Sequence, residues 1–200
     1  MDDAHMLSAR SLTGKPIGIV EDFITEQERK QLLFHAKSPK AQWDTSLPTT
    51  DVWHGRMINP SKMPAKTLKL MEKIRRRAAK TITAHYGIVD SVYADTLQLV
   101  RWRPGDSQAP HADCEHPNGK SNEFPWRAFA SIIYLNDEFT GGEIHFPVLG
   151  MQPTIKPRML AYFPSTAAYL HGVKKITSGM RYTHSCFYTF DPTHHDGHSV

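Results

Sequence analysis

The sequence predicts an α+β fold in which N-terminal helices buttress a closed double sheet of the jelly-roll type, a double-stranded β-helix. Apolar residues recur at helical spacing only in the first part of the chain, up to Tyr86. From Thr96 onward, short strand-like segments are separated by Gly, Pro and Asn-Asp turns and show no helical period. Helices that precede the strands, rather than alternate with them, favour this class over a parallel α/β sheet.

A short strand and a helix are predicted at the start of the domain. Residues 16–20 have the composition of a strand, and Thr25 and Glu28 have the spacing of a capping box. The helix that this box opens is expected to run to about Lys37, because Pro39 ends it. Its inward-facing residues are expected to be Leu32, Leu33 and Ala36.

A second helix is predicted from about Lys62 to Tyr86, after the irregular segment 40–60, and Gly87 caps its end. The basic run Lys73–Arg77 alternates with the apolar face of this helix, so it predicts a solvated stripe rather than a nucleic-acid surface. The apolar face, at steps of three and four, consists of Met71, Ile74, Ala78, Ile82 and Tyr86.

The chain is expected to form one domain. Its 200 residues, 40% hydrophobic and 22% charged, are typical of a globular protein with a sizeable core. The predicted organisation is a flexible N-terminus at 1–14, a single domain at 15–192 with helical support at 15–95 and a β-helix core at 96–192, and a polar tail at 193–200.

Composition restricts the partners and the compartment. The net charge of +4 is too mild to demand a polyanionic partner. Cys114 and Cys186 cannot form a disulfide framework, and free thiols fit a reducing compartment. No segment approaches the roughly 18 apolar residues of a membrane span, and the N-terminus has no apolar run of a secretory signal. We therefore expect a cytoplasmic protein without membrane association.

His111, Asp113 and His171 have the residue types of a metal site. Side chains two residues apart on a strand share a face, so His111 and Asp113 are expected to present an imidazole and a carboxylate to one point. With His171 from a distant strand they make two histidines and one carboxylate, the set that suits non-haem Fe(II) oxygenases and leaves coordination positions open.

Arg181 follows His171 by ten residues, beyond a turn at Ser178-Gly179. A guanidinium is a planar cation that grips a carboxylate with two hydrogen bonds. Thr183 shares its strand face and is expected to add a hydroxyl.

Together with their flanking segments, these residues make the chain resemble the 2-oxoglutarate/Fe(II)-dependent dioxygenases, in particular the prolyl-hydroxylase branch. The tail from His171 to Asp196 is most similar to prolyl 3-hydroxylase catalytic domains. The resemblance is specific over 97–192 and loose over 15–90. The segments that carry it, besides the histidines and the aspartate, are Ser131–Asp137, Gly141–Pro147, His171–Val173, Gly179–Arg181 and Phe187–Pro192.

The resemblance implies a hydroxylase that uses Fe(II), 2-oxoglutarate and O2, with ascorbate as reductant. It assigns the metal to His111, Asp113 and His171, and the far carboxylate of 2-oxoglutarate to Arg181. Halogenases of the superfamily have a small residue where Asp113 stands, so the carboxylate favours hydroxylation. The other residues expected around the cosubstrate are Tyr134 and Thr183, with Ile144 and Val173 as apolar walls.

The expected reaction is hydroxylation of an unactivated C–H bond, with a prolyl residue of a peptide or protein as the first hypothesis. A free amino acid or small natural-product precursor is the alternative. An oxidative nucleic-acid demethylase is disfavoured, because those enzymes have a second arginine where this chain has Phe187. A non-enzymatic, cupin-like metal-binding barrel leaves the position of Arg181 unexplained.

The substrate side is expected to come from the segment 40–60 and from the Pro-, Asn- and Gly-containing loop 115–126, which directly follows the proposed ligands. Many prolyl hydroxylases have a tyrosine on the strand before His-x-Asp, where this chain has Arg101–Gly105. Candidate substrate-side residues are Trp53, His54, Arg56, Arg103, Glu115 and Trp126.

Overall fold

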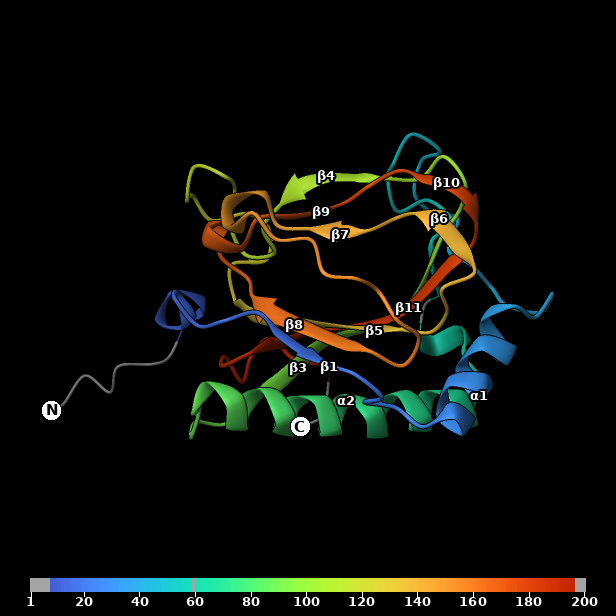
Figure 1. Cartoon of the computed structure of the whole chain (residues 1–200). Coiled ribbons are helices and arrows are strands. Elements are labelled where there is room, and N and C mark those ends of the chain that lie inside the picture. The colour runs from blue at the N-terminus through green and yellow to red at the C-terminus, as the bar shows by residue number, and fades with distance from the viewer. Residues whose placement is uncertain (1–7, 59, 197–200) are drawn as a thin grey trace, which may run out of the picture.

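Two antiparallel sheets face each other, and a long helix lies along the outer face of the larger sheet (Figure 1). This arrangement is seen in a computed structural model that describes residues 8–58 and 60–196. It confirms the predicted α+β class with helices that buttress a double sheet. None of the helices in these residues is long and apolar enough to span a bilayer.

The larger sheet has the strand order β1-β8-β5-β11-β3-β2, and every neighbouring pair is antiparallel. Its strands are β1 (Gly18–Val20), β2 (Met57–Ile58), β3 (Tyr93–Trp102), β5 (Arg127–Tyr134), β8 (Leu160–Pro164) and β11 (Arg181–Thr189). The predicted strand at 16–20 is therefore β1, two residues shorter at its start.

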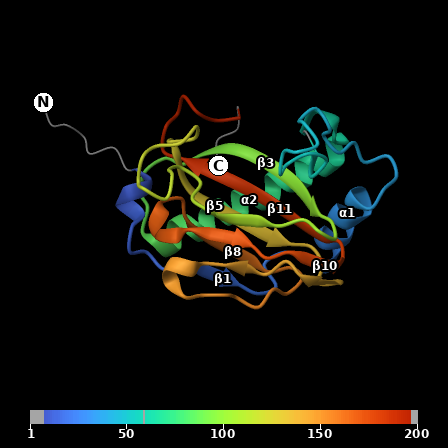
Figure 2. The ribbon, with the colours of Figure 1, turned by 90° about the horizontal axis from the view of Figure 1, so that it is seen from above.

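The smaller sheet has the order β4-β9-β7 and lies across from the larger one (Figure 1). In the view from above, β3, β11, β5 and β8 of the larger sheet lie side by side (Figure 2). A two-stranded ribbon of β6 and β10 stands beside it near the start of β11. The bounds are β4 (Gln108–His111), β7 (Ile144–His145), β9 (His171–Val173), β6 (Phe139–Gly141) and β10 (Ile176–Gly179).

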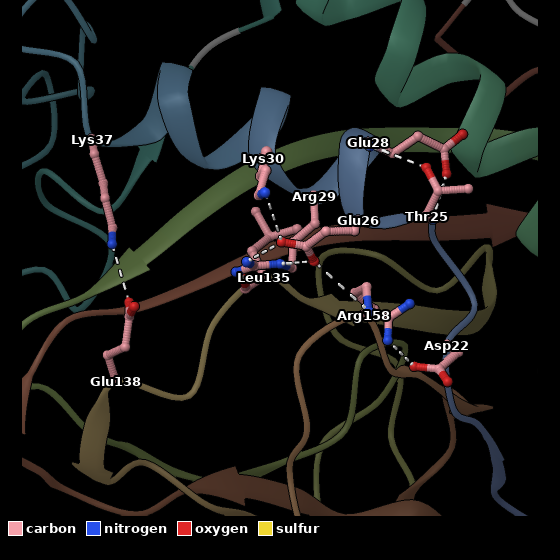
Figure 3. Close-up of polar contacts among 10 residues, drawn as sticks. All are labelled: Asp22, Thr25, Glu26, Glu28, Arg29, Lys30, Lys37, Leu135, Glu138 and Arg158. Carbon is pink, nitrogen blue, oxygen red and sulfur yellow. Dashed lines mark hydrogen bonds and ion pairs between the residues drawn. The ribbon is translucent and has the colours of Figure 1, made fainter.

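The first long helix, α1 (Glu26–Ala36), begins as predicted. The Thr25 hydroxyl accepts a hydrogen bond from the Glu28 backbone N–H at 3.1 Å, and the Glu28 carboxylate accepts one from the Thr25 N–H at 2.9 Å (Figure 3). Each backbone donor would otherwise lack a partner at the helix start. Arg29 then fastens the helix to the sheet by donating to the Leu135 carbonyl at 2.9 Å.

The second long helix, α2 (Ala65–Tyr86), starts three residues later than predicted. Pro60–Lys62 form a 3-10 turn, and Pro64, with φ −57° and ψ 138°, occupies the N-cap position. The end of α2 is as predicted, because Gly87 adopts φ 67°, the left-handed conformation of a glycine C-cap. Further 3-10 turns lie at Ala9–Leu12, Pro147–Leu149 and Ala167–Tyr169.

The main core lies between the helices and the outer face of the larger sheet. The five predicted residues of the α2 face and the three of α1 are all buried in it. On β11, Tyr182 and Cys186 join this core, whereas Arg181 and Thr183 point between the two sheets. Strand alternation thus separates a packing face from a face available for chemistry.

Two predictions at the surface are corrected. The basic run on α2 is not uniformly solvated, because Arg75 is 1% exposed and forms an ion pair with Asp196. That contact also orders the start of the predicted polar tail, whose residues 197–200 lie outside the described part of the chain.

At the other end, Leu12 is buried and its carbonyl accepts a hydrogen bond from the Tyr169 hydroxyl, so packing begins before residue 15. Residues 1–7 of the predicted flexible N-terminus also lie outside the described residues.

Candidate metal and cosubstrate site

His111, Asp113 and His171 converge between the two sheets. Each offers one ligand atom, and these three atoms lie within 4.8 Å of one another. The Nε2 atoms of His111 and His171 lie 3.7 and 3.8 Å from the same carboxylate oxygen, Oδ1 of Asp113. The other oxygen, Oδ2, is buried and has no hydrogen-bond partner within residues 8–58 and 60–196. A buried carboxylate oxygen without a donor beside two imidazoles is the environment that a divalent cation would satisfy.

The two histidines meet because β4 and β9 pair with His111 opposite His171. Gly172 allows this close approach, since a Cβ atom there would lie 2.8 Å from the Gln108 carbonyl oxygen. The predicted reason for the position of Asp113 is wrong, however. β4 ends at His111, and Asp113 lies beyond it in irregular chain, where its backbone N–H donates to the Ser165 carbonyl at 3.0 Å.

Both imidazoles are oriented by backbone carbonyls. Nδ1 of His171 lies 3.1 Å from the Tyr169 oxygen, and Nδ1 of His111 lies 3.1 Å from the Ala109 oxygen. Hydrogen on Nδ1 satisfies these carbonyls and leaves the Nε2 atoms as acceptors close to Asp113. Nε2 of His111 also lies 3.3 Å from the side-chain nitrogen of Gln108, which can donate to it. Burial lowers the pKa of His171 to about 4, although Asp113 opposes the shift, so the imidazole is neutral at physiological pH. A neutral imidazole is the form that binds metals.

Arg181 begins β11 and is 1% exposed. Its guanidinium lies 5.0 Å from the ring centre of Tyr134 and 5.4 Å from that of Trp102. Nε and Nη2 are buried and have no hydrogen-bond partner among the described residues. Burial lowers the pKa of Arg181, but a guanidinium remains charged. A buried cation with free donors is poised for an anionic ligand, and a carboxylate matches its geometry.

One cavity of about 330 Å³ contains both features. We call it the site cavity. Most of the residues predicted around the cosubstrate line it, whereas Tyr134 lies behind the lining and contacts Arg181 through its ring. The predicted site residues in the lining are His111, Asp113, His171, Arg181, Thr183, Ile144, Val173, Trp53 and Glu115.

Four predicted substrate-side residues, His54, Arg56, Arg103 and Trp126, do not line the site cavity, because other contacts hold them. Arg56 is buried in an ion pair with Asp106 at 3.1 Å, and Arg103 bonds to the same aspartate at 3.2 Å. Nδ1 of His54 lies 2.6 Å from the Leu47 carbonyl, and Trp126 stacks on His194 with ring centres 4.0 Å apart. That these four residues contact the substrate stays a prediction, because the structure places them outside the cavity lining.

Arg127 lines the cavity but was missed in the sequence. Its guanidinium carbon lies 3.9 Å from the ring centre of Phe124 and 3.8 Å from that of Phe187. Nε donates to Asp95 at 2.7 Å, which leaves the two Nη groups for other acceptors. Gln98 and Ser185, opposite each other on β3 and β11, also line the cavity.

Residues 97–189 match the family model described as the 2OG-Fe(II) oxygenase superfamily. These residues include the three candidate ligands and Arg181.

Among curated proteins, prolyl 3-hydroxylase 2 of Rattus norvegicus is 26% identical over 157 residues, which cover 68% of this chain and 22% of that protein. The 2-oxoglutarate and iron-dependent oxygenase domain-containing protein 3 of Xenopus tropicalis is 29% identical over 99 residues, which cover 47% of this chain and 31% of that protein. The chain thus spans less than a third of the length of either relative.

Solved structures agree with the fold. A viral collagen prolyl hydroxylase from Paramecium Bursaria Chlorella virus-1 has a TM-score of 0.66 at 19% identity, with 88% of this chain and 90% of that chain covered. A prolyl hydroxylase from Trichoplax adhaerens, in complex with a hypoxia inducible factor peptide fragment, has a TM-score of 0.62 at 16% identity, with 91% and 87% covered.

Proposed function

Because residues 97–189 match the family model of the 2OG-Fe(II) oxygenase superfamily, we propose that the chain is a 2-oxoglutarate- and Fe(II)-dependent hydroxylase whose substrate is a prolyl residue in a peptide or protein. The observation that carries the proposal is the presence, in one cavity, of a His/Asp/His cluster and a buried arginine with free donors. The prolyl assignment is supported by the names of the relatives, which include prolyl 3-hydroxylases.

His111, Asp113 and His171 are the proposed iron ligands. Their role is to hold the metal through two Nε2 atoms and one carboxylate while leaving positions open for the cosubstrate and oxygen. Bound Fe(II), with 2-oxoglutarate and O2, supplies the oxidising power for C–H hydroxylation, and the cosubstrate leaves as succinate and CO2. The backbone carbonyls at Tyr169 and Ala109 keep both imidazoles in the binding orientation.

Arg181 is the proposed partner of the far carboxylate of 2-oxoglutarate. Its buried donors would be satisfied by that group, and the hydroxyl of Thr183 lies on the same strand face to add a hydrogen bond. Ile144 and Val173 form the apolar walls that exclude water from the bound cosubstrate. The aromatic rings of Tyr134 and Trp102 hold the guanidinium in place.

Arg127 is the proposed contact for the backbone of a peptide substrate. The rings of Phe124 and Phe187 fix its guanidinium, and Asp95 occupies only Nε. The Nη groups are thus available to a peptide carbonyl at the cavity wall. A proline ring suits a neighbouring apolar position, because it is rigid and loses little conformational entropy when it binds.

The test is succinate formation by the purified protein with Fe(II), 2-oxoglutarate and proline-containing peptides, followed by mass spectrometry of the peptide. The proposal predicts succinate release above the peptide-free level and the addition of one oxygen atom to a proline. Oxidation of free amino acids without oxidation of peptides would replace the prolyl-peptide assignment with the small-molecule alternative. Absence of any Fe(II)-dependent succinate would reject the enzyme itself.

We also propose that ascorbate sustains turnover and that the protein works in the cytoplasm. Support for the compartment comes from Cys114 and Cys186, which are both free and buried. Omission of ascorbate should lower the number of turnovers per enzyme without changing the affinity for 2-oxoglutarate.

A further inference from the structure

A second hollow lies outside the site cavity, between α1 with the residues that follow it and the start of α2. It has a volume of about 1240 Å³, and none of its lining residues also lines the site cavity. We call it the α1–α2 groove. Its apolar members are Phe34, Met63, Pro64 and Leu70, and its cations are Lys30, Lys40, Lys62 and Lys66.

Phe34 is the most unusual residue of the groove. It is 83% exposed on α1, whereas Leu32, Leu33 and Ala36 of the same helix are buried in the core. The fold therefore does not need this aromatic side chain. A large, mostly exposed apolar residue beside a hollow with further apolar wall residues is typical of a surface that is covered by a partner.

The groove carries net positive charge. Lys40, Lys62 and Lys66 form no ion pair with the described residues. Glu26 is the only acidic residue in the lining, and Arg29 already holds both of its oxygens at 2.7 Å (Figure 3). The free charges at this site are therefore cations, and they attract an acidic ligand.

The first turn of α2 adds to the positive electrostatic potential of the groove. It contains no acidic residue, and its N-cap residue, Pro64, has no side chain that can accept a hydrogen bond. The positive end of a 22-residue helix thus faces the surroundings of Lys62 and Lys66 without an acidic side chain of its own.

We propose that the α1–α2 groove binds an acidic polypeptide segment that carries one bulky apolar residue. The apolar residue would pack against Phe34 and Leu70, while acidic side chains on either side pair with the lysines at the rim. A nucleic acid fits less well, because Phe34 and His35 are the only aromatic rings in the lining, and the walls formed by Met63 and Leu70 offer no further faces for stacked bases. This binding function goes beyond the hydroxylation proposed above and does not depend on it.

The test is fluorescence anisotropy with the full chain and a fluorescein-labelled peptide of sequence Glu-Asp-Glu-Leu-Glu-Asp-Glu. Phe34→Ser should weaken binding about tenfold or more, because a contact with a bulky apolar side chain is lost. Lys62→Glu combined with Lys66→Glu should weaken it at least as much. Lys80→Glu, an exposed charge reversal farther along α2, is the matched control and should leave binding near that of the wild type.

Circular dichroism of each variant verifies folding. Succinate formation in the absence of the peptide should be the same in all variants as in the wild type. A failure of the peptide-binding proposal can therefore be told apart from a failure of the proposed hydroxylase activity. The proposal is overturned if the peptide does not bind at low salt, or if Phe34→Ser binds it as well as the wild type does. It is also overturned if an oligouridylate binds more tightly than the peptide and displaces it, which would assign the surface to nucleic acid.

Discussion

Replacement of Arg181 by methionine should have two opposite effects: weaker binding of 2-oxoglutarate and a more stable ligand-free protein. Methionine has a similar length and no charge, so it fills the space between Tyr134 and Trp102 without the guanidinium. Truncation of one partner of a desolvated charge pair costs about 2–5 kcal/mol of binding free energy. The Kd of 2-oxoglutarate should therefore rise by a factor between about 30 and several thousand.

The same substitution should stabilise the protein in the absence of 2-oxoglutarate. Two buried donors of Arg181, Nε and Nη2, have no partner in the part of the chain that the structure describes, and an unsatisfied buried donor costs about 1–3 kcal/mol. Loss of the two ring contacts, each worth about 1 kcal/mol, offsets part of this gain. We expect the free energy of unfolding of Arg181→Met without ligand to rise by about 2 kcal/mol, the middle of the range that these figures give.

Calorimetric titration of 2-oxoglutarate into the manganese-loaded protein measures the first effect, and urea denaturation of the ligand-free protein measures the second. Lys174→Met, an exposed change of the same type near the end of β9, is the control and should alter neither quantity. Unchanged affinity in Arg181→Met would place the cosubstrate elsewhere. Loss of both affinity and stability would mean that Arg181 has a structural role that the free donors do not reveal.

Other variants and conditions test the rest of the site. Asp113→Ala should abolish succinate formation and lower iron content, measured by metal analysis, because two imidazoles alone leave the cation without an anionic ligand; full activity would remove Asp113 from the ligand set. Arg127→Ala should raise the KM for a proline-containing peptide with little change in the Kd of 2-oxoglutarate, and a selective effect on 2-oxoglutarate would reverse its assignment. The free energy of unfolding of the metal-free protein should fall as the pH is lowered from about 6.5 to about 4. Burial holds the pKa of His171 and His184 near 4, whereas the histidines of the unfolded chain take up protons near pH 6.5. Urea denaturation across this pH range measures the free energy of unfolding, and a profile without pH dependence would contradict neutral, buried histidines.

The helices could be predicted because their signals are local. The capping box of Thr25 and Glu28 and the three- and four-residue steps on α2 depend on neighbours within a turn, and the structure has them as expected. The predicted start of α2 was three residues too early. The 3-10 turn at Pro60–Lys62 and the Pro64 cap occupy only a few residues, too few to change the periodicity that indicated a helix. Side-chain contacts between residues far apart in the sequence, such as the Arg75–Asp196 ion pair, could not be predicted from local patterns.

The structure brings the predicted metal and cosubstrate residues together, but not for all of the reasons that the sequence suggested. Asp113 lies beside the histidines because Ser165, on a distant segment, holds its backbone, and no local pattern encodes that contact. Arg127 was missed because β5 and β11 shift register between Tyr188 and Thr189, so simple alternation from Tyr134 gives the wrong face for it. The four substrate-side residues that do not line the cavity lie in irregular parts of the chain, where Gly and Pro reveal turns but not the direction of side chains.

The central claim is that the His/Asp/His cluster and Arg181 form one 2-oxoglutarate-dependent iron site. The most direct test is a binding measurement in which 2-oxoglutarate is titrated into metal-free protein and into protein loaded with Fe(II) under anaerobic conditions. One site predicts that the metal tightens 2-oxoglutarate binding and that Asp113→Ala removes this enhancement while Arg181→Met weakens binding with or without metal. Equal affinity with and without metal in the wild type would show that the two groups do not act on one ligand, and would contradict the claim.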